Sequence, residues 1–199
     1  MTRALLYLAS ASPRRSELLR QIDVAHEVRP VVIDESPQAG EAPARYVLRL
    51  AERKARTLWE SLPAAQRLPV LAADTTVALA GEILGKPADL ADARSMLSRL
   101  AGRTHEVHTA VAVLHEGEVA ARVNTSTVSF RDLSAQEIDW YWQTGEPADK
   151  AGAYAVQGKA AIFISRIAGS YSGVMGLPLY ETWELLGPVL GLTGRSTLS

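Results

Sequence analysis

The sequence predicts an α/β fold built on a central, twisted, mixed β-sheet flanked by helices. Short apolar, β-rich runs alternate with segments of helical periodicity along almost the whole chain. One pair of β-rich runs follows without an intervening helix, which favours a mixed sheet over a purely parallel one. The chain has 199 residues, 47% of them hydrophobic, which is enough for one sizeable core, and we expect a single domain over residues 1–190.

The N-terminal part is expected to form a strand, a helix and an extended segment. Residues 4–9, "ALLYLA", are short and apolar, and they read as a buried strand. Ser12 is a suitable N-cap and Pro13 suits a first helical position, so a helix follows over residues 13–22. Residues 26–35 form a second extended segment.

The middle of the chain contains the clearest helix. Residues 43–62 carry apolar side chains on one side and basic side chains on the other. Residues 68–84 read as a strand that turns at Ala80-Gly81, and residues 89–102 as a helix capped by Asp89.

The C-terminal half combines a hairpin, two helices, a strand and a loop. In order, we expect a hairpin over 105–130 with its turn near Glu116-Gly117, a helix over 134–145 opened by the Ser134 capping box, a strand over 160–169, a loop over 170–176, a helix over 177–186 and a flexible tail over 191–199.

Composition excludes several classes of function. The net charge of −1 argues against a general nucleic-acid binder, and the lack of cysteine excludes thiolate metal sites and cysteine nucleophiles. No apolar run approaches the roughly 18 residues that cross a bilayer or resembles a signal peptide. We therefore expect a cytoplasmic protein without membrane or stable nucleic-acid partners. His105 and His108 lie three apart in a β-rich segment and should face opposite ways, so a shared zinc ion is not expected.

Two adjacent arginines, Arg14 and Arg15, follow Ser10, Ser12 and Pro13 where the first strand gives way to a helix. Helix N-termini attract anions, and cations there are unfavourable unless an anion joins them. An arginine fork also matches phosphate oxygens. Taken alone, this segment fits a solvated first turn and a phosphate site equally well.

Asp74 lies in the apolar run "LAADTTVAL", where an aspartate is either paired, metal-bound or capping a turn. Asp34-Glu35 offers oxygen ligands that suit a hard divalent cation, although such a pair is often a solvated turn. Lys86 in "ILGKP" precedes a proline, which excludes a Walker A loop and leaves a ligand-directed or an exposed lysine. Gln157 either reads a base edge through its amide or faces water in a tight turn.

The order of these motifs is far more specific than any one of them. "LASASPRRSELL", "AERKA", "LAADTTV", "GEILGKP", "GRTHEVHTAVAV", "GAYAVQGKAAIFI" and "GSYSGVMGLPLYET" together closely resemble the Maf family of nucleoside triphosphate pyrophosphatases. The resemblance implies an elongated fold with two lobes and a cleft, a homodimer, and a reaction that depends on Mg²⁺ or Mn²⁺. It also implies hydrolysis of a nucleoside triphosphate to the monophosphate and pyrophosphate.

The resemblance assigns a role to each matching position. It implies Asp74 as the catalytic residue, with Glu35 and Asp74 as metal ligands. Phosphate binding falls on Ser10, Ser12, Arg15, Lys54 and Lys86, and substrate choice falls on Arg14, Thr75 and Gln157. One departure is Asp23, where the family pattern more often has a glycine, and we expect it to affect only the end of the first helix.

Arg14, Thr75 and Gln157 agree with the dTTP/UTP branch of the family, which implies a house-cleaning enzyme acting on dTTP, UTP and modified pyrimidine nucleotides. One alternative is the 7-methyl-GTP branch, which carries an aromatic residue at the position of Arg14. The other is a non-catalytic nucleotide-binding regulator of septum formation or cell division. For the enzyme, our hypothesis is that Asp74 activates the attacking water, directly or through the metal, while Glu35 helps to hold the cation.

Overall fold

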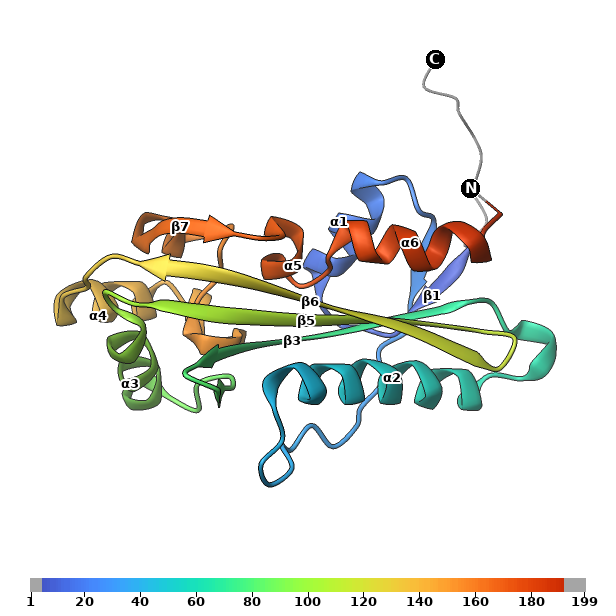
Figure 1. The fold of residues 1–199 in the computed structure, drawn as a ribbon, viewed down its shortest axis with the longest axis horizontal. Helices are drawn as coiled ribbons and strands as arrows, with labels where there is room; N and C mark the ends of the chain where they lie inside the picture. Colours follow the sequence, from blue (N-terminus) through green and yellow to red (C-terminus); the bar gives the residue numbers. More distant parts are fainter. Residues whose placement is uncertain (1–4, 192–199) are drawn as a thin grey trace, which may run out of the picture.

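The computed structural model describes residues 5–191, and in this part of the chain one mixed sheet runs along the molecule (Figure 1). Its strand order is β2-β1-β3-β5-β6-β7, with β4 paired to β3. The strands are β1 (Leu6–Leu8), β2 (His26–Val28), β3 (Val70–Leu79), β4 (Glu82–Leu84), β5 (Thr104–His115), β6 (Glu118–Phe130) and β7 (Ile164–Ala168). The tail expected over 191–199 lies outside the described residues from residue 192 onward.

The sheet is mixed, as predicted. β1 pairs in parallel with β2 and with β3, whereas the remaining described pairings are antiparallel. The long strands β3, β5 and β6 twist around one another along the longest dimension, which makes the molecule elongated (Figure 1). The predicted α/β class is therefore confirmed.

Helices cover both faces at one end of the sheet and gather at the other end (Figure 1). The helices are α1 (Pro13–Gln21), α2 (Pro43–Ser61), α3 (Leu90–Leu100), α4 (Ala135–Gln143), α5 (Tyr171–Met175) and α6 (Leu179–Val189). Helix α2 packs on one face of β3 and β5, α1 and α6 pack on the opposite face, and α3 and α4 enclose a third apolar cluster.

Burial on both faces explains the continuous apolar run at the start of β3. Val70 and Ala72 pack in the cluster under α2, whereas Leu71 and Ala73 pack in the cluster under α1 and α6. Successive strand residues point to opposite faces, so both faces must be apolar where helices cover both. A polar side chain in this run, such as Asp74, needs a partner.

The two tight turns were predicted correctly. Ala80 and Gly81 between β3 and β4 have φ of 51° and 82°, and Glu116 and Gly117 between β5 and β6 have φ of 52° and 88°. Two successive positive φ values are typical of the turns that join twisted antiparallel strands. Asp23 also has a positive φ, 55°, directly after α1, which explains why a glycine suits this position.

Three segments differ from the expectation. The strand expected over 160–169 begins only at β7, because Lys159–Phe163 forms a 3-10 turn that buries Ala160 and Phe163, three residues apart. The loop expected over 170–176 contains the short helix α5, whose N-cap Ser170 accepts a 2.9 Å hydrogen bond from the Gly173 amide. Only His26–Val28 of the extended segment forms a strand.

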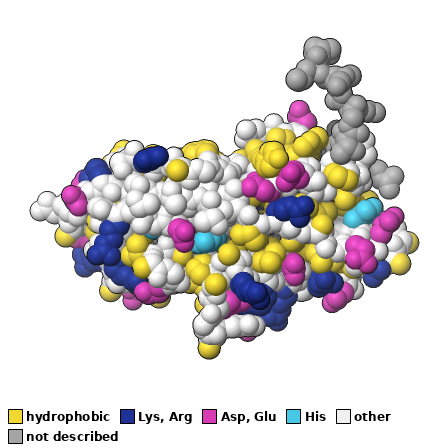
Figure 2. All heavy atoms as spheres, viewed as in Figure 1, with side chains coloured by type: hydrophobic (Ala, Val, Ile, Leu, Met, Phe, Trp, Pro, Cys, Tyr) yellow, Lys and Arg dark blue, Asp and Glu magenta, His cyan; other side chains and the backbone are white. Residues whose placement is uncertain are grey.

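The surface carries charges of both signs. Figure 2 shows basic and acidic side chains interspersed across one face of the molecule, as the net charge of −1 suggests. Within residues 5–191, no helix combines the length and apolar character that a membrane crossing requires.

Candidate active site

An open cleft of about 450 Å³ lies beside the middle of β3, between the loop that follows β1 and the loop that follows β4. The backbone creates it, because β1 pairs with β3 only at Val70 and Leu71, and β4 pairs with β3 only from Val77 onward. Among the described strands, residues 72–76 therefore have a partner, β5, on one side only. The cleft opens along this unpaired stretch of β3 and reaches both faces of the sheet.

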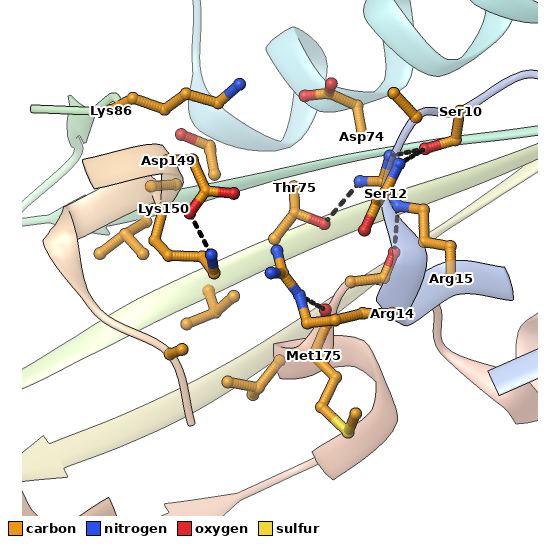
Figure 3. Close-up of a pocket in the computed structure, with 18 of the residues that line it drawn as sticks. Ser10, Ser12, Arg14, Arg15, Asp74, Thr75, Lys86, Asp149, Lys150 and Met175 are labelled. Carbon is orange, nitrogen blue, oxygen red and sulfur yellow. Dashed lines mark hydrogen bonds and ion pairs between the residues drawn. The ribbon is translucent and has the colours of Figure 1, made fainter. Parts of the chain in front are cut away.

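All ten residues that the sequence assigned to the site line this one cleft, and Figure 3 labels seven of them. They are Ser10, Ser12, Arg14, Arg15, Glu35, Lys54, Asp74, Thr75, Lys86 and Gln157. They come from the loop between β1 and α1, from α1, α2 and β3, and from three further loops. Residues far apart in the sequence thus converge on one concave surface.

Asp74 and Thr75 are neighbours in β3 and face opposite sides of the sheet. Asp74 points to the side of α2 and is only 6% exposed. Thr75 points to the other side, where its hydroxyl accepts a 3.2 Å hydrogen bond from Arg15 Nη2. One strand therefore presents an acid to one face of the cleft and a hydroxyl to the other.

Lys54 is the partner of Asp74. It lies in the apolar stripe of α2, among Val47, Ala51 and Leu58, and its Nζ donates a 2.7 Å hydrogen bond to Asp74 Oδ1. The same Nζ lies 2.5 Å from Glu35 Oε1. A lysine in an otherwise buried helical stripe is rare without such a partner, and here it brings two carboxylates together.

Burial dominates the electrostatics of Asp74. Loss of water around the carboxyl raises its pKa, and the positive charges of Lys54 and Arg15 oppose that rise. The neighbouring Arg15 is partly buried, and loss of water around its guanidinium lowers its pKa from the ordinary value. An aspartate with a raised pKa accepts a proton more readily than an exposed aspartate.

The two adjacent arginines are used differently. Arg15 donates hydrogen bonds to Ser10 Oγ at 3.0 Å, to Thr75 Oγ1 and, through Nε, to the Gly176 carbonyl oxygen at 2.8 Å. Arg14 donates through Nε to the Met175 carbonyl oxygen at 3.2 Å, and its guanidinium extends into the cleft (Figure 3). Within the described chain, neither arginine has a carboxylate within 4 Å.

The first turn of α1 is arranged to receive an anion. Ser12 is the N-cap residue as predicted, but its side chain makes no capping hydrogen bond. Instead, the Ser12 amide donates to Ser10 Oγ at 3.2 Å, and the first turn contains no acidic residue. The helix dipole and two arginines therefore meet at the cleft without a described counter-ion, which favours an anion site over a solvated turn.

Several residues in and beside the cleft were not predicted from the sequence. Tyr46 lines the cleft and donates a 2.9 Å hydrogen bond to the Glu35 carbonyl oxygen. Thr109 is buried beside the cleft, and its Oγ1 lies 3.0 Å from Oγ1 of the lining residue Thr75. Asp149 and Lys150 form an ion pair on the wall beside Lys86 (Figure 3). The sequence signal that could have predicted this last pair lies in the adjacent acidic and basic residues shortly before the "GAYAVQG" loop.

The acidic residues limit how a metal can be held. In the described part of the chain, no group of three or more His, Asp or Glu side chains is arranged to bind a metal ion. His105 and His108 point to different partners, Tyr154 and Thr125, as their spacing in β5 predicts. Asp74 and Glu35 are the two carboxylates that converge in the cleft, on Lys54.

Comparison with known proteins identifies the family of the chain. The Maf family, described as Maf-like protein, matches residues 5–189. The chain is 52% identical over 193 residues to a dTTP/UTP pyrophosphatase of Nitrosomonas europaea, covering 91% of this chain and 92% of the relative. It is 55% identical over 190 residues to one of Bordetella avium (91% and 93%) and 54% over 182 residues to one of Myxococcus xanthus (92% and 91%). With matches over almost its whole length, the chain belongs to the Maf family.

Proposed function

We propose that this chain hydrolyses dTTP and UTP between the α- and β-phosphates, releasing the nucleoside monophosphate and pyrophosphate. Relatives that carry the name dTTP/UTP pyrophosphatase are 51–55% identical over more than nine tenths of the chain, which supports the substrate class. The observation that carries the proposal is the buried carboxylate of Asp74, placed in a cleft that several lysine and arginine side chains also line.

The cations suit a triphosphate. Arg14 and Arg15 on α1, Lys54 on α2 and Lys86 after β4 come from three segments and line the same cleft. A nucleoside triphosphate with about four negative charges needs neutralisation along its length before water can attack. We assign direct phosphate contact to Arg14, Lys86 and the amides of the first turn of α1. Arg15 supports them, because its hydrogen bonds hold Ser10, Thr75 and Gly176 in place.

The carboxylates suit a divalent cation. Asp74 and Glu35 both lie within hydrogen-bond distance of Lys54 Nζ, so their hard oxygen atoms converge on one region of the cleft. A bound Mg²⁺ or Mn²⁺ would take these two carboxylates together with phosphate oxygens and water, and it would neutralise charge on the phosphates. Two protein carboxylates are few, which makes the substrate itself part of the metal site.

Asp74 is the residue we assign to water activation. Its Oδ1 accepts from Lys54, and its Oδ2 is the atom that we assign to the proton of the attacking water. Burial of the carboxyl excludes bulk solvent and keeps its geometry fixed. Lys54 orients this carboxylate and offsets its repulsion from Glu35, so it is a positioning residue as well as a cation.

Base selection is assigned to Gln157, Thr75 and Arg14. Gln157 is exposed at the cleft, where its amide offers one donor group and one acceptor. Uracil and thymine present a donor, N3–H, between two carbonyl acceptors, so an amide can pair with that edge. Arg14 lines the same cleft. The 7-methyl-GTP branch has an aromatic residue at this position, which would stack on a larger base.

The proposal extends to the setting of the enzyme. We propose a single domain over residues 1–190, a homodimer, a cytoplasmic location and a role in cleaning the nucleotide pool. These follow from the family resemblance and from the composition of the sequence. Size-exclusion chromatography with light scattering tests the dimer, and a monomer at micromolar concentration would contradict it.

The direct experiment incubates the purified chain with a panel of triphosphates and Mg²⁺ or Mn²⁺. We expect pyrophosphate and monophosphate from dTTP and UTP, and slower release from CTP, GTP and 7-methyl-GTP. Preferential hydrolysis of 7-methyl-GTP would contradict the substrate assignment. Tight binding of dTTP without any pyrophosphate would support a nucleotide-binding regulator instead.

A further inference from the structure

Lys150 and Asp149 form an ion pair in the wall of the cleft, where no role has been assigned to them (Figure 3). The two side chains differ sharply in exposure. The lysine side chain is 13% exposed, whereas the aspartate side chain is 72% exposed. Most of the lysine side chain is therefore buried in the cleft wall, and the aspartate side chain lies largely in contact with solvent.

The segment that carries this pair is held firmly. The Gly152 amide donates a 2.9 Å hydrogen bond to the Gly85 carbonyl oxygen, which ties the segment to the loop of Lys86. A Cβ at Gly152 would lie 2.9 Å from the Val77 side chain, so the backbone packs directly on β3. These contacts hold the backbone next to Lys150 against β3 and the loop of Lys86, unlike that of a lysine on a mobile surface loop.

A nearly buried ammonium needs an anion, and Asp149 supplies it in the absence of ligand. Hydrogen bonding to Lys150 lowers the pKa of Asp149, and the charge of Arg14 lowers it further. The carboxylate thus lies in the field of two cations from different elements, Arg14 on α1 and Lys150 beyond the 3-10 turn η2 (Glu146–Asp149). An anion between these cations is favoured, whether it belongs to the protein or to a substrate.

We propose that Lys150 is a further substrate-binding residue and that Asp149 is its temporary counter-ion, which a phosphate oxygen of the nucleoside triphosphate displaces. This inference rests on the proposed function. A phosphate group carries more charge than one carboxylate and so competes well for Lys150 and Arg14 together. Asp149 returns to water at little cost because most of its side chain is already solvated.

The alternative is an ion pair that only stabilises the loop. That role predicts a loss of stability when either partner is removed, with no change in nucleotide affinity. The counter-ion role predicts opposite effects of the two partners on affinity. Removing Lys150 weakens binding, whereas removing the charge of Asp149 strengthens it, since the substrate no longer has to displace a carboxylate.

The experiment measures binding of α,β-imido-dTTP, which resists hydrolysis between the α- and β-phosphates, by isothermal titration calorimetry. We expect Lys150→Met to raise the Kd about tenfold and Asp149→Asn to lower it about threefold. Lys159→Met is the matched control, because Lys159 is an exposed lysine of the same region that does not line the cleft. Its Kd should equal that of the unmodified chain.

Unchanged affinity in Lys150→Met, or unchanged or weaker affinity in Asp149→Asn, would overturn the proposal. Circular dichroism checks the fold of each variant, and if Lys150→Met does not fold, Asp149→Asn decides the question alone. Failure of the proposed function is seen separately, as the absence of pyrophosphate release from dTTP by the unmodified chain. Binding of the analogue tests the roles of Lys150 and Asp149 whether or not turnover occurs.

Discussion

Lys54 Nζ donates a 2.7 Å hydrogen bond to Asp74 Oδ1, and this contact joins the middle of α2 to the unpaired stretch of β3. Both residues are buried, with 9% and 6% of their surfaces exposed. The same ammonium lies 2.5 Å from Glu35 Oε1. Lys54 therefore keeps two carboxylates close together that would otherwise repel each other.

Loss of Lys54 should destabilise the fold as well as the site. Lys54→Met leaves Asp74 buried without its cation, and we expect the free energy of unfolding to fall by about 3 kcal/mol. Adding Asp74→Asn to Lys54→Met should recover part of this loss, because the uncompensated charge is removed. Urea denaturation measures both effects, with Lys159→Met as the control. A Lys54→Met variant as stable as the unmodified chain would refute the pairing.

Thr109 should act as a positioning residue for Thr75. Its buried hydroxyl lies 3.0 Å from Thr75 Oγ1 and 2.8 Å from the Gly173 carbonyl oxygen, which links β3 to α5. Thr109→Val removes this link without changing shape. We expect the KM for dTTP to rise about fivefold, as loss of one hydrogen bond worth about 1 kcal/mol implies, with little change in kcat.

The conservative variant Thr109→Ser supplies the control for this prediction. Serine retains the hydroxyl that reaches Thr75 and Gly173, so its KM should return close to that of the unmodified enzyme. Steady-state kinetics on both variants decide the matter. A KM that Thr109→Val leaves unchanged would show that Thr75 does not depend on this contact.

Local patterns were enough to predict most of the fold. The turn pairs Ala80-Gly81 and Glu116-Gly117 and the amphipathic stripe of α2 are short-range signals, and each element formed where expected. The strand expected over 160–169 was partly wrong, because residues 159–163 form a 3-10 turn that buries Phe163 against Tyr141, with ring centroids 5.3 Å apart. That contact comes from the tertiary structure.

The convergence of the ten site residues in one cleft was predictable from the sequence, but the shape of the cleft was not, and their roles remain predictions. The sequence motifs named the ten cleft residues that the structure brings together. The interruption in pairing along β3 depends on how far β1 and β4 extend, which no single segment of the sequence determines. Lys150 was missed for the same reason, since the burial of its side chain depends on contacts with β3 and the loop of Gly85.

His105 should make stability depend on pH. Burial lowers its pKa from 6.5 to about 4, and its Nε2 lies 2.8 Å from the Tyr154 hydroxyl. Below pH 6.5 the unfolded chain binds a proton that the folded chain does not, so stability falls as pH falls from 6.5 toward 4. We expect a loss of about 2 kcal/mol between pH 7.5 and pH 5 from this group.

Urea denaturation of the unmodified chain and of His105→Asn at several pH values tests this prediction. The variant should lack the fall between pH 6.5 and 5, whatever its stability at pH 7.5. His115→Gln is the control, because that histidine is partly exposed at the end of β5. Equal pH dependence in the His105→Asn variant and the unmodified chain would exclude His105 as the source.

Gln157 should influence the choice of base. Gln157→Ala removes the amide that we assign to the edge of uracil and thymine, and the preference for UTP over CTP in kcat/KM should narrow about tenfold. Gln143→Ala, at the exposed end of α4, provides a matched control outside the cleft. Competition assays with UTP and CTP give the ratio of their kcat/KM values directly. An unchanged ratio in Gln157→Ala would show that Gln157 does not recognise the base.

The most direct measurement is pyrophosphate release from dTTP by Asp74→Asn. The substitution keeps the shape of the side chain and removes its ability to take a proton, so we expect kcat to fall about 10³-fold. Binding of α,β-imido-dTTP should remain measurable, and Asp23→Asn, an exposed aspartate at the end of α1, should retain full activity. Near-normal turnover by the folded Asp74→Asn variant would contradict the assignment of Asp74 to water activation.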